Sequence, residues 1–214
     1  MLPSVARGQL HRAAGRPWAA PLGAILLLTI FLAASRVATG ARSPVWPHGA
    51  VRIYDASGMH GDVATAAQRW NESGARVRLR FVRAPQLADV VVRVDDRELV
   101  GRCGRDCLGY TTSIGRPSGG RIDIMLRSSL GGTPRPLSVW VAAHELGHVL
   151  GLHHRNGNAC SLMSARAFDT RCAPSMSGTA PTASDLECIP APRDVKLAAA
   201  MYGGAPASND PRCR

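Results

Sequence analysis

Alternating apolar and polar residues predict four β-strands in this chain. In the first of them, Val51 and Ile53 alternate with Arg52 and Tyr54, which is the pattern of a strand with one buried face. The third is almost continuously apolar and is therefore expected at the centre of a sheet. The four predicted strands are Ala50–Ser57, Val77–Ala84, Ala88–Asp96 and Gly120–Ser128.

Three other segments repeat their apolar residues with the period of a helix. Each ends at or near a glycine, which is a common helix stop, and Asp194 is a candidate N-cap of the last one. The second is the strongest, because Val139, Ala143, Leu146 and Leu150 fall on one face. The predicted helices are Asp62–Gly74, Pro136–Gly151 and Pro192–Gly204.

The first 40 residues have the pattern of a secretory signal. Three arginines precede the apolar run Gly23–Ala34, and the small residues Ala38 and Gly40 follow it as at a cleavage site. The run is short for a membrane span, which needs about 20 apolar residues. We expect cleavage after Gly40 and a secreted protein. An uncleaved N-terminal anchor, with the rest of the chain outside the membrane, is the alternative.

The length of 214 residues fits one ordinary domain with its own core. The formal net charge is +11, and four of these charges lie in the first 40 residues, which leaves +7 on the rest. Those remaining basic residues are scattered and no basic and aromatic module accompanies them, so nucleic-acid binding is not expected. We divide the chain into a signal peptide or anchor (1–40), a short lead (41–49), a folded domain (50–204) and a tail (205–214).

All six cysteines follow the signal segment. An even number of cysteines in an exported domain indicates disulfides, and six cysteines allow 15 pairings. Zinc binding by these cysteines is the weaker interpretation, because no paired C-x-x-C spacing is present. Proximity along the chain favours the pairs Cys103–Cys107, Cys160–Cys172 and Cys188–Cys213.

The stretch HELGHVLGLHH, residues 144–154, contains four of the seven histidines. On a helix, His144 and His148 lie one turn apart on the same face and can hold one ion between them. Gly151 lets the chain turn back and bring His154 to the same ion. Three imidazoles leave one position open for water on a tetrahedral zinc, and Glu145 lies beside the ion where a general base is needed.

Three alternatives remain open from these residues. His153 is out of register for the ion and is expected to face solvent or to support a ligand. A non-catalytic zinc-stabilised binding module would explain the three ligands but not Glu145. A membrane-anchored interaction protein would explain the apolar run but not the histidines.

The same stretch resembles the long zinc-binding consensus of the metzincin endopeptidases. The resemblance places His144, His148 and His154 at the ligand positions and Glu145 at the position of the general base. Metzincins also have a methionine turn below the metal, and here SLMS offers Met163 as a packing residue. The implied fold is a single α+β zincin domain with a twisted, mostly parallel sheet, an edge strand, an active-site helix and a C-terminal helix.

Two branches of that family are similar to different parts of the chain. The last predicted helix starts at proline and closes on MYG, much as in matrixins, and the third histidine ligand is also matrixin-like. Cys160 and Cys172 bracket SLMS as in small secreted snapalysin-type proteases, whose third ligand is instead an aspartate. Residues 41–49 leave no room for a matrixin propeptide. The segment RCGRD superficially resembles an inhibitory cysteine switch, but a disulfide from Cys103 to Cys107 is the expected use.

The resemblance implies a secreted, monomeric zinc endopeptidase that cleaves proteins or peptides. A single catalytic zinc ion is expected, with a water molecule activated by Glu145. An extended substrate would add along the edge of the strand at Gly120–Ser128. Calcium is possible but not indicated, because no calcium-loop pattern accompanies the available acidic residues, which are Asp95, Asp96, Asp106 and Asp123.

Overall fold

A computed structural model gives the fold of the chain. It describes residues 45–133, 135–155, 161–165 and 188–207, and all of these belong to one structural unit within Gly40–Arg214. The predicted signal segment lies outside the described residues. Within the described residues, no helix combines the length and the apolar character needed to cross a membrane.

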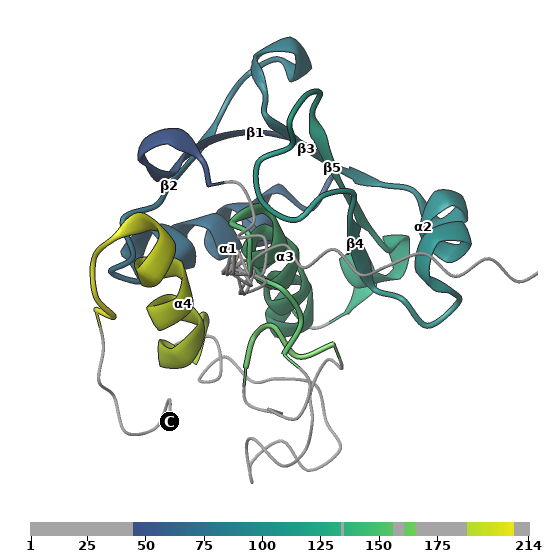
Figure 1. Ribbon diagram of the computed structural model, residues 1–214. Coiled ribbons are helices and arrows are strands. Elements are labelled where there is room, and N and C mark those ends of the chain that lie inside the picture. The colour runs from purple at the N-terminus through teal and green to yellow at the C-terminus, as the bar shows by residue number, and fades with distance from the viewer. Residues whose placement is uncertain (1–44, 134, 156–160, 166–187, 208–214) are drawn as a thin grey trace, which may run out of the picture. The chain divides into compact units, whose positions relative to one another are not determined.

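A five-stranded mixed sheet forms the frame of this unit (Figure 1). Its spatial order is β2-β1-β3-β5-β4, with parallel pairing throughout except that β4 runs antiparallel to β5. The strands are β1 (Ala50–Ala56), β2 (Arg78–Phe81), β3 (Val90–Val94), β4 (Gly109–Thr111) and β5 (Ile122–Leu126). The sheet is thus mostly parallel, as predicted.

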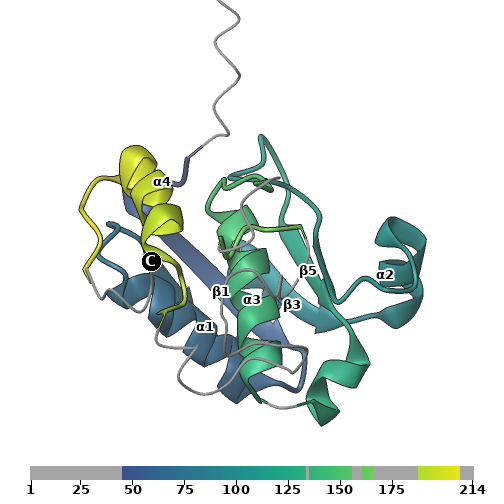
Figure 2. The same cartoon turned by 90° about the horizontal axis from the view of Figure 1, so that it is seen from below.

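Two helices, α1 (His60–Glu72) and α3 (Arg135–Val149), lie side by side on one face of the sheet (Figure 2). Alternate strand residues and the apolar faces of both helices form the main core between these layers. Trp70 of α1 is fully buried, and its indole Nε1 donates a hydrogen bond of 2.9 Å to the carbonyl of Ala143 in α3. This contact sets α3, the helix with the histidine motif, against the core.

A short helix, α2 (Asp96–Cys103), packs against β4 and β5. The sequence pattern predicts a strand that continues to Asp96, whereas the structure begins a helix there. The helix begins there because the Asp95 side chain accepts a hydrogen bond from the backbone N–H of Glu98, which caps its first turn. Leu99 of this helix and Met125 of β5 are both fully buried, but they lie outside the main core cluster.

The edge strand beside the histidines is β4, and this corrects the prediction that Gly120–Ser128 forms that edge. Strand β5, which covers most of that segment, is hydrogen-bonded on both sides, to β3 and to β4. The glycine-rich sequence around β4 concealed a three-residue strand whose formation depends on pairing with β5. Gly109 pairs with Leu126 and Thr111 with Ile124.

The lead and the C-terminal helix both contact the end of α3. Trp46 is 6% exposed and donates from its indole to the carbonyl of Val149 at 2.7 Å. Tyr202, at the end of α4 (Pro192–Tyr202), donates to the carbonyl of Leu150 at 2.9 Å. These two side chains occupy carbonyls that a helix end otherwise leaves unpaired.

One predicted disulfide, Cys103–Cys107, is present and joins the end of α2 to the segment that leads into β4. Cys188 also belongs to a disulfide. Cys160, Cys172 and Cys213 lie outside the described residues, so the pairings Cys160–Cys172 and Cys188–Cys213 stay predictions.

Candidate metal centre

Helix α3 and the turn after it bring three histidines together. His144 and His148 lie one helical turn apart and are both buried, at 6% and 7% exposure. The helix ends in a turn at Gly151, whose φ of 92° lies in the left-handed region that favours glycine. Its backbone N–H bonds the carbonyl of His148 at 2.9 Å, and the chain then returns so that His154 faces the other two rings.

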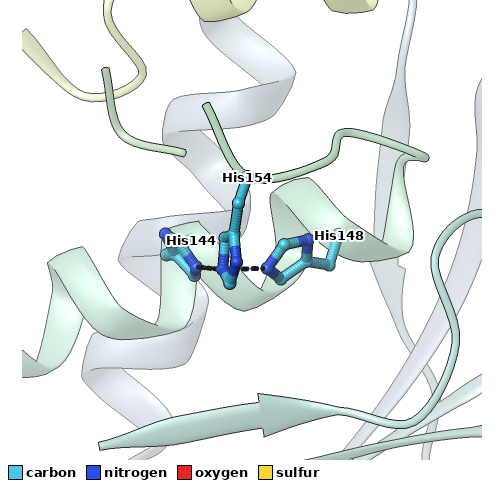
Figure 3. A group of neighbouring side chains, drawn as sticks. All are labelled: His144, His148 and His154. Carbon is cyan, nitrogen blue, oxygen red and sulfur yellow. Dashed lines mark hydrogen bonds between the residues drawn. The ribbon is translucent and has the colours of Figure 1, made fainter. Parts of the chain in front are cut away.

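The three imidazoles converge on one point through their Nε2 atoms (Figure 3). His154 Nε2 lies 3.1 Å from His144 Nε2 and 3.0 Å from His148 Nε2. Nitrogens bound to a single tetrahedral zinc are about 3.4 Å apart, given zinc–nitrogen bonds of about 2.0–2.1 Å. Among the described residues, this is the one group of three histidine, cysteine or acidic side chains that could hold a metal ion.

Hydrogen bonds behind the rings fix which nitrogen of each buried histidine faces that point. His144 Nδ1 lies 2.6 Å from the carbonyl of Leu162, and His148 Nδ1 lies 2.7 Å from the carbonyl of Leu152. A carbonyl only accepts, so each Nδ1 carries the proton and each neutral ring directs an Nε2 lone pair inward. One N–H on His154 cannot satisfy both lone pairs, whereas a cation can. The donor set therefore fits a metal ion such as zinc.

Burial also keeps these rings neutral. Desolvation, and next the neighbouring His148, lowers the pKa of His144 to about 3. Desolvation lowers the pKa of His148 to about 4, and it lowers the pKa of His154 as well. A metal ligand must be unprotonated, so all three side chains are ready to bind a cation near neutral pH.

The turn at residues 161–164 is hydrogen-bonded to His144 and to the residue that follows His154. The carbonyl of Leu162 holds His144, and the carbonyl of Met163 accepts a hydrogen bond of 2.9 Å from the N–H of Arg155, next to His154. Met163 is fully buried and its sulfur lies where a side chain on Gly147 would have to go. Met163 therefore packs against Gly147 of α3, the helix that contains two of the histidines.

Asp194 of α4 holds this turn. Its fully buried carboxylate accepts hydrogen bonds from the Ser161 hydroxyl and, at 2.7 Å, from the N–H of Leu162. The sequence pattern had made Asp194 a helix cap, but the N-cap of α4 is Ala191 and Asp194 lies in the first turn. A connection therefore runs from α4 through the backbone of Leu162 to the ring of His144.

Glu145 is buried beside the three histidines, at 4% exposure. Burial raises the pKa of Glu145 to about 7, and a hydrogen bond from Thr111 of β4 opposes that rise. The Thr111 hydroxyl lies 2.6 Å from Glu145 Oε2. On the other side, a Cβ added to Gly109 would lie 2.6 Å from Oε1. The edge strand thus contacts this carboxylate at two alternate residues.

These groups line one groove with a volume of about 660 Å³. Its walls include Tyr110 and Ile114 from β4 and the segment after it, and Trp140 from α3. The Trp140 ring stacks on His144, with centroids 5.3 Å apart and planes at 23°. The site combines a metal-binding set, a buried carboxylate and an apolar surface that can contact a ligand.

The structure brings together His144, His148 and His154 with Glu145, whereas His153 is exposed and is not one of the three. Thr111 and Asp194 were missed as site residues, because each acts across more than 30 positions of sequence. Of the acidic residues considered for calcium, Asp95 and Asp123 both contact Arg93, and Asp96 contacts Ser128.

Comparison with known proteins adds little to this description. No protein-family model matches the chain, and no curated protein matches it. Two solved structures of myroilysin align with it at 20% identity. One covers 51% of this chain and 44% of that chain with a TM-score of 0.40, and the other covers 54% and 53% with a TM-score of 0.38. The alignment thus spans about half of each myroilysin chain.

Replacing Asp194 with alanine should weaken zinc binding by about 10- to 100-fold, the range found when an outer partner of a metal ligand is lost. The matched control is Asp96→Ala, because Asp96 also accepts from one serine hydroxyl and one backbone N–H, both of Ser128. Competition with a chromophoric chelator measures both affinities. Equal zinc affinities in the two variants would contradict a supporting role for Asp194.

The lowered pKa values of His144 and His148 predict that the metal-free protein loses stability between about pH 6.5 and about pH 4, against an opposite contribution from the single raised pKa of Glu145. In this window an unfolded chain protonates its histidines while the buried rings stay neutral. The unfolded state then binds more protons, so the free energy of unfolding falls as the pH falls. Urea denaturation in EDTA measures this, and the variant His144→Gln/His148→Gln should show a smaller decrease. An equal decrease in both proteins would show that protonation of these two histidines does not cause the loss of stability.

Proposed function

We propose that this protein is a zinc-dependent endopeptidase of the metzincin type. The observation that carries the proposal is the convergence of three Nε2 atoms beside a buried glutamate in one groove. A zinc-stabilised binding module needs the histidines but gives no reason to bury Glu145. Removing a carboxylate from water is costly, and an ionisable group with a strongly shifted pKa in a groove is typical of a catalytic site.

Each residue then has a defined task. His144, His148 and His154 would hold the ion. A zinc ion held there would supply a Lewis acid that lowers the pKa of water and polarises a peptide carbonyl. Glu145 accepts a proton from the attacking water and passes it to the leaving amine. Its raised pKa, about 7 in the metal-free site, suits a group that both accepts and donates a proton.

The groove supports a peptide as substrate. Within the part of the chain that the structure describes, strand β4 pairs on one side only, with β5, so its other edge can pair with an extended chain. Ile114 and Trp140 provide apolar surface for side chains on either side of the cleaved bond. We therefore assign the substrate-binding edge to Gly109–Thr111 instead of the strand at 120–128.

Replacing Glu145 with glutamine should lower kcat against a peptide library by about 100-fold or more, because the general base is lost, while zinc remains bound at one ion per chain. His154→Gln should instead lose zinc together with activity. His153→Gln is the matched control, since it changes the adjacent histidine, which is not one of the three. Excess chelator should stop cleavage by the wild type.

Two outcomes would contradict the proposed function. Cleavage by Glu145→Gln at the wild-type rate would show that Glu145 is not the general base. A wild type that binds one zinc but cleaves no peptide in the library would favour a non-catalytic zinc module.

We further propose that the protein is exported as a monomer, with residues 1–40 removed as a signal peptide. The mature chain then comprises the lead (41–49), the peptidase domain (50–204) and the tail (205–214). N-terminal sequencing of protein collected outside the producing cells should begin near Ala41. A start near Met1 on membrane-bound material would show instead that the apolar run is an anchor.

A further inference from the structure

The edge strand β4 borders the groove, and it also lies against the carboxylate of Glu145. Its alternate residues Gly109 and Thr111 face α3, and both meet the carboxylate of Glu145. Successive side chains of a strand point to opposite faces, so Tyr110 between them faces the other way. The two residues of the strand that face α3 thus border the space that this carboxylate occupies.

Thr111 is placed to hold one carboxylate oxygen. Its side chain is 8% exposed, and its hydroxyl lies 2.6 Å from Glu145 Oε2 and 3.3 Å from the Glu145 carbonyl. A hydroxyl has one proton, and the shorter of the two contacts takes it. The strand itself is fixed by antiparallel pairing of Thr111 with Ile124. The donor therefore sits on a rigid element.

Gly109 leaves space at the other oxygen. A Cβ at this position would lie 2.6 Å from Glu145 Oε1, 2.9 Å from its Cγ and 2.9 Å from Val141 Cγ1. Oε1 is the oxygen that Thr111 does not engage. A glutamate side chain has several rotatable bonds, and holding it in one geometry is what proton transfer at a defined atom requires.

We propose that Thr111 is a positioning residue for Glu145. Its hydroxyl holds Oε2 and leaves Oε1, the oxygen beside Gly109, as the atom that accepts and returns the proton. This inference rests on the proposed peptidase function, in which Glu145 is the general base. Thr111 itself does not contact the reacting atoms.

Three variants and a control test the inference. Thr111→Val keeps the branched shape but removes the hydroxyl, and it should lower kcat by about 10- to 100-fold with KM within about two-fold. Thr111→Ser restores the hydroxyl and should return kcat to within about three-fold of the wild type. Gly109→Ala leaves Thr111 intact but displaces the carboxylate, and it should also lower kcat. The matched control is Thr133→Val, which removes a hydroxyl that donates at 2.8 Å to the Leu130 carbonyl.

Zinc content must stay at one ion per chain in every variant, which separates positioning from loss of the metal. A kcat for Thr111→Val equal to the wild type would overturn the inference. So would a value for Thr111→Ser as low as that of Thr111→Val, because the hydroxyl would then not be the cause. A change in KM alone would assign Thr111 to substrate binding and would also overturn it.

Crystal structures of the metal-free wild type, Thr111→Val and Thr111→Ser provide a readout without catalysis. The Glu145 carboxylate should leave its position in Thr111→Val and keep it in Thr111→Ser. If the wild type cleaves no peptide, the proposed function fails, while these structures still decide whether Thr111 positions the carboxylate. An unmoved carboxylate in Thr111→Val would overturn the inference even in an active peptidase.

Discussion

The hydrogen bond from His144 Nδ1 to the carbonyl of Leu162 is the contact on which the site depends. It fixes the tautomer of a buried ring and ties the helix with the motif to a turn from a later part of the chain. That turn is held in its own right by Asp194. Without that turn, His144 would still have the right spacing from His148, but nothing would fix the position of its proton or direct its Nε2 lone pair inward.

The sheet contributes to the site by placing the short strand β4 on the other side of the groove. Parallel pairing of β1, β3 and β5 places a rigid, buried layer beneath α3, and β4 joins it in the opposite direction. The backbone of a strand paired in this way moves with the sheet. The groove is therefore built from one rigid helix, one rigid strand edge and a turn that is fixed by hydrogen bonds.

Local patterns in the sequence were sufficient for the parts of the site that lie close together in the chain. Helical spacing placed His144 and His148, and a glycine in the left-handed region brought His154 round. The sequence also contains a signal for the start of α2, because Asp95 and Glu98 have the spacing of a helix cap. The predicted strand nevertheless extended past Asp95. Thr111 and β4 were not readable, because a three-residue strand forms only through pairing with β5 and periodicity over such a length indicates nothing.

The arrangement around Glu145 also explains why the edge strand contains a glycine where a side chain would otherwise strengthen it. Glycine weakens a strand, yet any side chain at 109 would collide with the Glu145 carboxylate and with Val141. Pairing with β5 and the disulfide from Cys103 to Cys107 just before the strand offset that weakness. An edge strand that meets a carboxylate on one face, and that is paired on one side only within the described residues, cannot be stabilised by large side chains. Its neighbours stabilise it instead, namely strand β5 and the disulfide from Cys103 to Cys107.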